Sequence, residues 1–396
     1  MLAPRAPWPQ DDGGRVVLWQ DLLAVAGRFE TRLIVLCTGP GAPPAVPAEL
    51  LRLGVEVSFV EHRMPSTPVA LVQGALGRWP YTLARYHSQA FERALRAIVA
   101  SWRPDLVFIH HLHMATYVNA LDGCVKVLRE HNLEHLWMRR YARAGHNPAV
   151  AAYASFQAHR LRRTEAELCA RMDLILAIQD DEAAAIRAFA PGVPVEAVPV
   201  GATFVANLRR SLAPEPTLLL VGSFDREPNA DGARRFLEEG WPIVHAGLPG
   251  ARLRIIGREI PDRLAALARS RGAEPVGFVP DLSLEFARAW AVVIPLWVGA
   301  GVRVKMVQAI AAGVPVVSTS LGAEGVGLEP DRHFRVGETG AALGSGALEL
   351  LAHPGPAARL AAEAHAFMRE RFGREAVALR TVALCERALG ARVGAS

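Results

Sequence analysis

Lysine is almost absent from this chain of 396 residues: Lys126 and Lys305 are the only two, and every other basic residue is an arginine. Arginine therefore serves wherever a plain positive charge is enough. A lysine that remains indicates a position where a compact, flexible point charge is useful. Lys305, which lies among glycines and apolar residues, is therefore a candidate functional cation.

Cysteines and long apolar runs are also scarce. The four cysteines lie far apart and form no Cys-x-x-Cys pair, so no zinc site or disulfide framework is indicated and a reducing cytoplasm fits. The longest apolar run, 289–302, is too short for a membrane span and is interrupted by Pro295. The first residues lack the apolar segment of a signal peptide. We therefore expect a cytoplasmic protein, at most peripheral on the inner face of a membrane.

Apolar runs of strand length alternate with amphipathic helical stretches, which is typical of parallel α/β domains. At 51% hydrophobic residues, the chain can form two domains with separate cores. Pro-rich sequence near 197–216 indicates a linker, and 357–389 is predicted to be helical. The predicted strands are 32–37, 55–59, 106–110, 125–129 and 174–178 before the linker, and 217–221, 253–256, 274–277, 291–294 and 315–318 after it.

The beginning of the first predicted domain is unusual. A doubly wound domain normally opens with an apolar strand that leads into a glycine turn, here Gly13-Gly14. Only Met1-Leu2-Ala3 precedes Pro4, which is too short for that central strand. Either the true start lies upstream or the sheet is damaged; we favour the first interpretation.

The segment around Lys305 predicts an anion site. Residues 299–318 read as a glycine turn, a short helix with Arg303 and Lys305 in its first turn, a stop at Gly313 and a buried strand. The start of a helix that carries two cations suits an anion, most often phosphate. The alternative is a solvated helix face, but the flanking glycines and apolar runs leave little exposed surface.

Polar groups in the first half also follow predicted strands, at the edge where α/β sheets bind ligands. His110, His111 and His113 come after the strand at 106–110, and His131 follows the strand at 125–129. A metal site is disfavoured, because neighbouring side chains of an extended segment point to opposite faces and no acidic ligand accompanies them. His131 is predicted to donate to a phosphate or sugar oxygen; alternatively it is a loop histidine bonded to backbone.

The positive charge of the chain is concentrated in residues 126–171, whose nine basic and four acidic residues give the whole net charge of +5. Such a stretch is a candidate contact for anionic lipid or a polyanionic acceptor, and the alternative is a solvated helical face rich in arginine. Nucleic acid is not expected, because no binding motif or stacking platform accompanies the charge. The basic residues are Lys126, Arg129, Arg139, Arg140, Arg143, Arg160, Arg162, Arg163 and Arg171.

Several segments together resemble a known family. Residues 217–232, 276–282, 299–318 and 321–325 resemble the second domain of group 1 glycosyltransferases, the large retaining family 4, and Gly13-Gly14 with 130–134 are similar to its first domain. The resemblance spans nearly the whole chain. It implies the GT-B fold, in which two Rossmann-like doubly wound domains face each other across a cleft and the last helix crosses back to the first domain. The implied boundaries are 1–203, 204–372 and 373–396.

The resemblance also implies a function. Members of the family transfer a sugar from a nucleotide-sugar donor to a glycan or lipid-linked acceptor with retention, usually without a bound metal or other cofactor, and often in envelope or exopolysaccharide synthesis. His131, Arg303 and Lys305 would be catalytic, since cations must hold the charge of the leaving nucleoside diphosphate. The implied substrate-binding residues are Gly13, Gly14, Gly222, Ser223, Asn229, Phe278, Val279, Gly301, Gln308, Ala323 and Glu324.

The chain departs from the family pattern at two pairs of positions. Two glutamates eight residues apart in many members are Ala300 and Gln308 here. An arginine and a lysine after the first strand of the second domain are Ser223 and Asn229. Arg303 and Lys305 would replace the positive charge that is lost there.

Three other functions are alternatives to this one. Ala300 and Gln308, in place of the two glutamates, and the short first strand favour a non-catalytic partner subunit that binds sugar nucleotide. Phosphorylases with this fold carry pyridoxal phosphate on a lysine, but the motif around Lys305 argues against that chemistry. A dehydrogenase that uses NAD is disfavoured, since no Gly-x-Gly-x-x-Gly follows a first strand.

Overall fold

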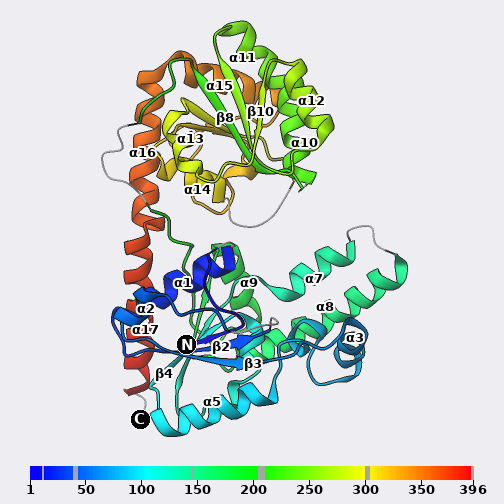
Figure 1. Cartoon of the computed structure of the whole chain (residues 1–396), viewed down its shortest axis with the longest axis vertical. Helices are drawn as coiled ribbons and strands as arrows, with labels where there is room; N and C mark the ends of the chain where they lie inside the picture. Colours follow the sequence, from blue (N-terminus) through cyan, green and yellow to red (C-terminus); the bar gives the residue numbers. More distant parts are fainter. Residues whose placement is uncertain are drawn as a thin grey trace. The chain divides into compact units, whose positions relative to one another are not determined.

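The computed structural model describes residues 1–10, 13–38, 43–143, 147–203, 210–225, 227–298 and 304–393. The chain divides into two compact units, each of which contains a parallel β-sheet with helices on both faces (Figure 1). Unit 1 consists of Met1–Gly201 and Val377–Ser396, and unit 2 consists of Ala202–Ala376. The predicted fold class, two Rossmann-like α/β domains, is confirmed.

The sheet of unit 1 has seven parallel strands in the order β3-β2-β1-β4-β5-β6-β7. Most of its inner strands are rich in apolar residues, as expected where both faces are covered, whereas the edge strand β3 alternates polar and apolar residues. Their bounds are Leu2–Ala3 (β1), Arg32–Cys37 (β2), Glu56–Glu61 (β3), Leu106–His110 (β4), Val125–Arg129 (β5), Leu174–Ala177 (β6) and Val195–Ala197 (β7).

The first strand corrects one expectation from the sequence. Strand β1 is only two residues long, yet it lies at the centre of the sheet, where Leu2 pairs with Ile34 of β2 and with Ile109 of β4. Leu2 and Ala3 are buried. The expectation that residues 1–3 are too short to form the central strand is therefore wrong, because hydrogen bonds to a neighbour on each side hold this short segment.

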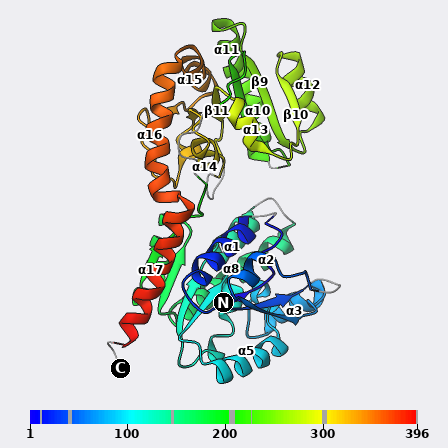
Figure 2. The same ribbon diagram turned by 60° about the vertical axis from the view of Figure 1, so that its left-hand side comes forward.

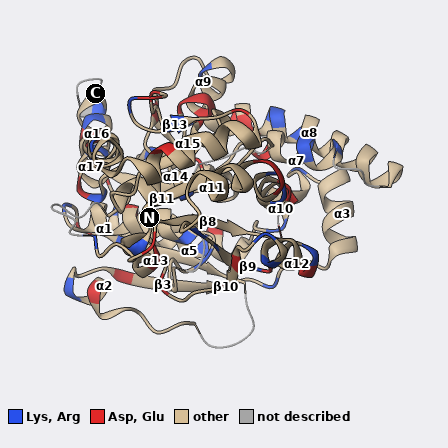
Figure 3. Ribbon diagram, turned by 90° about the horizontal axis from the view of Figure 1, so that it is seen from above, with Lys and Arg blue, Asp and Glu red and all other residues tan. Residues whose placement is uncertain are grey.

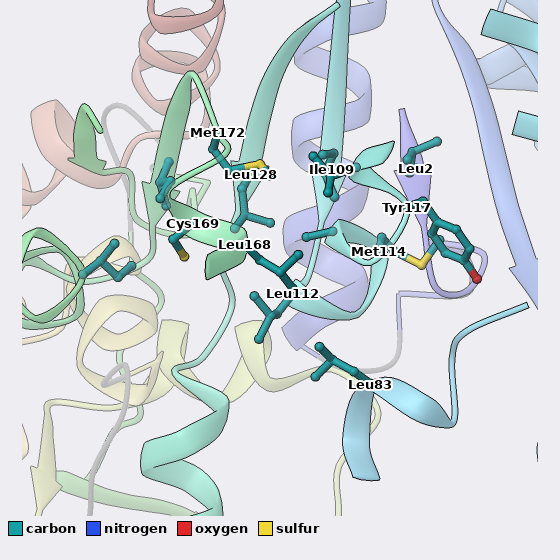
Figure 4. Close-up of a cluster of buried hydrophobic side chains, with 14 of the residues drawn as sticks. Leu2, Leu83, Ile109, Leu112, Met114, Tyr117, Leu128, Leu168, Cys169 and Met172 are labelled. Carbon is teal, nitrogen blue, oxygen red and sulfur yellow. The ribbon is translucent and has the colours of Figure 1, made fainter. Parts of the chain in front are cut away.

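Alternating side chains of these strands divide the core of unit 1 into two layers. On one face, Ile109 and Leu128 pack with helices α5 (Gln89–Trp102), α8 (Pro148–Cys169) and α9 (Asp180–Phe189) (Figure 4). The other face is covered by α1 (Gly13–Ala26), α2 (Ala48–Arg52) and α17 (Arg374–Val393). The remaining helices of this unit are α3 (Thr67–Leu76), α4 (Tyr81–Ala84), α6 (Leu112–Ala115) and α7 (Glu134–Arg143).

The end of the chain belongs to the core of unit 1. Val377, Leu384 and Cys385 of α17 pack with Val25 of α1 and Phe108 of β4, and α1 and α17 lie side by side in Figures 1 and 2. The return of the last helix to the first domain is thus confirmed. The helical tail is two helices, however, because Gly373 interrupts it between α16 (Pro354–Phe372) and α17.

The sheet of unit 2 has six parallel strands in the order β10-β9-β8-β11-β12-β13. The strands are Thr217–Ser223 (β8), Arg252–Arg258 (β9), Glu274–Gly277 (β10), Ala291–Ile294 (β11), Val316–Ser318 (β12) and Arg335–Val336 (β13). Helices α10 (Glu227–Arg235), α11 (Trp241–Gly247), α12 (Asp262–Ser270) and α15 (Gly340–Ala352) cover one face, and α13 (Leu282–Arg288), α14 (Val304–Ala311) and α16 cover the other.

The strand order reverses once in each sheet, between β1 and β4 in unit 1 and between β8 and β11 in unit 2. At such a reversal the connections leave in opposite directions and open a crevice beyond the carboxyl ends of the strands, where α/β proteins bind ligands. Among the described residues, no helix combines the length and the apolar character that crossing a membrane requires.

Two glycines, Gly222 of β8 and Gly257 of β9, lie opposite each other in the sheet, which gives a test of the fold. Gly257 has φ +151°, and a Cβ atom there would lie 1.5 Å from the carbonyl oxygen of Gly222. We expect Gly257→Ala to lower the free energy of unfolding by about 3 kcal/mol or more, since backbone must move. Urea unfolding followed by circular dichroism measures the loss. Gly250→Ala is the matched control, because its Cβ meets open space; equal midpoints for the two variants would contradict the expected strain.

Candidate functional site

A small pocket lies at the reversal of strand order in unit 2. It is bounded by the carboxyl ends of β8 and β11 and by side chains of α10 and α14. Its position is the one at which open α/β sheets bind ligands. The lining residues are Leu220, Val221, Asn229, Ile294, Pro295, Leu296 and Lys305.

Lys305 is held in this pocket by a chain of hydrogen bonds. Its ammonium group donates to Oδ1 of Asn229 at 2.7 Å, and Nδ2 of Asn229 donates to the carbonyl oxygen of Ser223 at 2.7 Å. The amide of Asn229 therefore fixes the cation between the end of β8 and the first turn of α14. A half-buried lysine at the start of a helix offers both its own charge and the helix dipole to an anion.

Two further predicted residues adjoin the end of this sheet. Ala323 is buried in a short 3-10 turn, Leu321–Ala323, and Glu324 follows it on the surface. A Cβ atom at Gly322 would lie 2.2 Å from Oγ of Ser318, so the turn lies directly against the end of β12. The turn is held by this close packing and by the backbone N–H of Gly322, which donates to Oγ1 of Thr319 at 3.0 Å.

The other predicted donor-site residues are more scattered. Gln308 is exposed on α14, one turn beyond Lys305. Phe278 and Val279 follow the edge strand β10; the ring of Phe278 is 67% exposed, and Val279 packs partly into the core. Gly301 and Arg303 lie outside the described residues. The structure therefore brings together Gly222, Ser223, Asn229 and Lys305 around the ends of β8 and β11.

In unit 1, the predicted residues divide between a helix start and a cluster of histidines. Gly13 and Gly14 begin α1, with Gly13 exposed. His131 is only 6% exposed; its Nε2 lies 3.2 Å from Nδ1 of His110, and its ring stacks on that of His111 with the centroids 3.7 Å apart. Burial lowers the pKa of these three histidines well below that of a free histidine. All three are therefore neutral at pH 7.

The backbone at His111 is held in an unusual conformation. Its φ of 65° lies in the left-handed region, which non-glycine residues rarely adopt. This conformation directs the chain from β4 into α6 while the ring of His111 covers His131. His113 lies further along, with Nε2 3.9 Å from Oε1 of Glu134, and burial lowers its pKa to about 4. Strained backbone of this kind is concentrated at functional sites.

A buried ion pair between Asp21 and Arg129, which was not predicted from the sequence, lies beside the histidines. Nε of Arg129 donates to Oδ2 of Asp21 at 3.0 Å, and Nη1 donates to the carbonyl oxygens of Val198 and Ala177. The same Oδ2 lies 3.9 Å from Nε2 of His110. Burial raises the pKa of Asp21, and Arg129 opposes that rise. The available signal was a charged residue at a buried position of each of two mainly apolar segments, Asp21 in α1 and Arg129 in β5.

The histidines do not form a metal site with other residues. Within the described ranges, no group of three or more His, Cys, Asp or Glu side chains is placed so that it could hold a metal ion.

The Asp21–Arg129 pair gives a test of this support. Asp21→Asn leaves a buried guanidinium without its counter-charge, and we expect it to lower the free energy of unfolding by about 3 kcal/mol or more. The double variant Asp21→Leu with Arg129→Met should recover part of that loss, because no buried charge then remains. Urea titration of the three proteins measures both effects. A single variant as stable as the wild type would show that the pair does not hold this region.

Two family models match the chain. Residues 215–353 match the family described as glycosyl transferases group 1, and residues 48–202 match glycosyltransferase family 4. The first match lies within unit 2 and the second almost entirely within unit 1. No curated protein sequence matches the chain.

Solved structures with similar folds cover nearly the whole chain. Sucrose-phosphate synthase from Thermosynechococcus elongatus has 17% identity and a TM-score of 0.66 over 98% of each chain. The Anabaena protein HepE in complex with UDP has 13% identity and a TM-score of 0.63, over 98% of this chain and 99% of that one. WaaG, a glycosyltransferase involved in lipopolysaccharide biosynthesis, has 12% identity and a TM-score of 0.61, over 97% of this chain and 98% of its own. Each unit thus matches a glycosyltransferase domain, and the chain is a glycosyltransferase with the GT-B fold.

Proposed function

We propose that the chain transfers a sugar, of the hexosyl type, from a nucleotide-sugar donor to a glycan or lipid-linked acceptor with retention. The reaction proceeds without a bound metal or other cofactor and serves envelope or exopolysaccharide synthesis at the cytoplasmic face of the membrane. The observation that carries the proposal is the placement of Lys305 at the strand reversal of unit 2, held there by Asn229.

In this proposal, Lys305 receives the diphosphate of the donor. As the bond to the sugar breaks, negative charge collects on the leaving diphosphate and must be stabilised in place. The ammonium of Lys305 and the amino end of α14 supply that stabilisation, and Arg303 adds a second charge. Asn229 lies where relatives carry a lysine, and the ammonium of Lys305 reaches that same position. Lys305 of α14 therefore supplies the positive charge that is lost where Asn229 replaces the lysine of many relatives.

The remaining donor contacts follow from the same arrangement. Gln308, one turn beyond Lys305, would bond a ribose hydroxyl, and Val279 would meet the base through its main chain beside Phe278. Ala323 and Glu324 would contact the donor sugar or phosphate, with Gly222, Ser223 and Gly301 as backbone donors. UDP is the first nucleotide to test, because the similar Anabaena protein was solved with UDP.

His131 would act on the sugar from unit 1, and Gly13 and Gly14 at the start of α1 would contribute to substrate binding. The hydrogen bond between His131 and His110 decides which ring atom of His131 is available. Nε2 of His131 is engaged with Nδ1 of His110 at 3.2 Å, which leaves Nδ1 of His131 for the substrate. We infer that this atom forms the hydrogen bond to the sugar or phosphate.

The alternative is a non-catalytic partner subunit that binds sugar nucleotide. Ala300 and Gln308, which replace the two glutamates of many relatives, favour it. It is distinguished from the enzyme by release of nucleoside diphosphate from the donor, which the partner subunit would not produce even when nucleotide binds.

The first prediction of this function concerns nucleotide binding. UDP, GDP, ADP and TDP are compared by the shift they cause in thermal unfolding, and one of them should stabilise the wild type. Lys305→Ala should weaken that binding about tenfold to a hundredfold, because it removes a charged hydrogen bond. Asn229→Asp should also weaken it, because a carboxylate beside Lys305 offsets the positive charge and no longer donates to the carbonyl oxygen of Ser223.

Lys126→Ala is the matched control, because it removes the other lysine, which lies in unit 1 and donates to the carbonyl oxygen of Cys124. Failure of every nucleotide to stabilise the folded wild type would overturn the donor site.

A second prediction concerns His131. His131→Ala should lower kcat about tenfold to a hundredfold while the thermal shift caused by the nucleotide stays at the wild-type value. His159→Ala, an exposed histidine of α8, is the control and should leave kcat unchanged. Loss of nucleotide binding together with kcat would show that His131 acts through the fold instead.

A further inference from the structure

Helix α3 of unit 1 is unusual because it has no charged side chain and exposes apolar ones. Its residues, Thr67–Leu76, include only two polar side chains, Thr67 and Gln73. Val69, Val72 and Leu76 are spaced by three and four residues, so they form one stripe, and they are 48%, 59% and 85% exposed. A helix that is apolar on all sides is normally buried. The exposed stripe therefore requires a partner.

Helix α3 packs on the rest of unit 1 through its opposite side, so the stripe is not the side that attaches the helix to its own unit. Ala70 and Gly74 are buried there, and a Cβ atom at Gly74 would lie 2.7 Å from Cα of Tyr81. Tyr153 of α8 donates to the carbonyl oxygen of Leu71 at 2.8 Å, and Gln157 donates to that of Gly74 at 2.9 Å. Helix α8 thus holds α3 with its apolar stripe facing outward.

Positive charge surrounds the stripe. Residues 62–91 contain three arginines, Arg63, Arg78 and Arg85, and no acidic residue. On α8, Phe156 is 46% exposed, and Arg160 and Arg163 follow it at four and seven positions, so the three share one face of the helix. Arg160 also donates to the carbonyl oxygen of Gly77, which places this face beside the end of α3.

Helix α3 is uncharged throughout in Figure 3, whereas basic residues mark α8. We define the α3–α8 patch as Val69, Leu71, Val72, Leu76, Phe156, Arg78, Arg160 and Arg163.

We propose that the α3–α8 patch docks unit 1 on a membrane that contains anionic phospholipid. The apolar stripe enters the boundary between headgroups and acyl chains, and the exposed Arg78 and Arg163 meet the phosphates, while Arg160 stays bonded to carbonyl oxygens at the end of α3. Charge complementarity selects this partner, because an apolar surface flanked by the exposed Arg78 and Arg163 matches an anionic lipid surface. The proposal also reduces the number of basic residues in 126–171 that could contact a membrane. Arg129 is buried against Asp21, and Lys126 donates to the carbonyl oxygen of Cys124, so neither belongs to this patch.

This inference rests on the proposed function only for its purpose, which is to bring the site to a lipid-linked acceptor. The two are tested separately, because docking is measured without any nucleotide.

The test is sedimentation of the full chain with vesicles of phosphatidylcholine alone or mixed with phosphatidylglycerol. The wild type should bind the mixed vesicles, and raised salt should weaken that binding. The triple variant Val69→Gln, Val72→Gln and Leu76→Gln should bind at least about tenfold more weakly, because the stripe can no longer enter the lipid. Arg78→Gln and Arg163→Gln should each weaken binding about fivefold.

The matched control has three substitutions of equally exposed leucines on other helices: Leu51→Gln on α2, Leu284→Gln on α13 and Leu379→Gln on α17, which are 63%, 64% and 72% exposed. It should bind like the wild type. Equal binding by the two triple variants, or no binding of the wild type to mixed vesicles, would overturn the proposal. A wild-type dimer in light scattering that the α3 variant abolishes, without vesicle binding, would assign the stripe to a second copy instead.

The thermal shift caused by nucleotide should be the same in every variant. This measurement therefore tests the proposed donor site independently of the membrane proposal.

Discussion

Parallel strands that are covered on both faces must be joined by helices that pass over alternate faces, and the rest of this structure depends on that constraint. Because each sheet starts with an inner strand, β1 or β8, the helices must change faces beside it. The crevice created by this change receives the carboxyl ends of two strands. In unit 2 a pocket at this point is lined by Lys305 and Asn229, and in unit 1 the histidines lie at the carboxyl ends of β4 and β5.

The fold was largely predictable, because continuous apolar runs mark strands buried on both faces. The expected limits of β2, β4, β5 and β10 agree with the structure to the residue. The error at β1 arose because length was taken as the criterion, whereas the two residues are held by neighbours distant in sequence. The helical pattern of 357–389 did not predict the break at Gly373, since a glycine within such a pattern often stays helical, although the family resemblance divided the chain at this residue.

The site was predictable in composition but not in geometry. The scarcity of lysine pointed to Lys305, yet its contact with Asn229, 76 positions away, depends on how two helices meet across the sheet. The strand pattern placed His131 just beyond the carboxyl end of a strand, but it could not reveal that Nε2 of His131 forms a hydrogen bond with His110. The Asp21–Arg129 pair joins α1 to β5, and long-range pairing of this kind leaves in the sequence only a charge where an apolar residue would be expected.

The position of α17 has a consequence for the order of folding during synthesis. Domains usually fold as they leave the ribosome, the amino-terminal one first. Here the core that joins Val25 and Phe108 stays open until Val377 and Leu384 have been made, after all of unit 2. Unit 2, whose residues are contiguous, can close its own core earlier. A nascent chain would therefore carry an incomplete first domain past the completion of the second, with the apolar surface that α17 later covers available to chaperones throughout that interval.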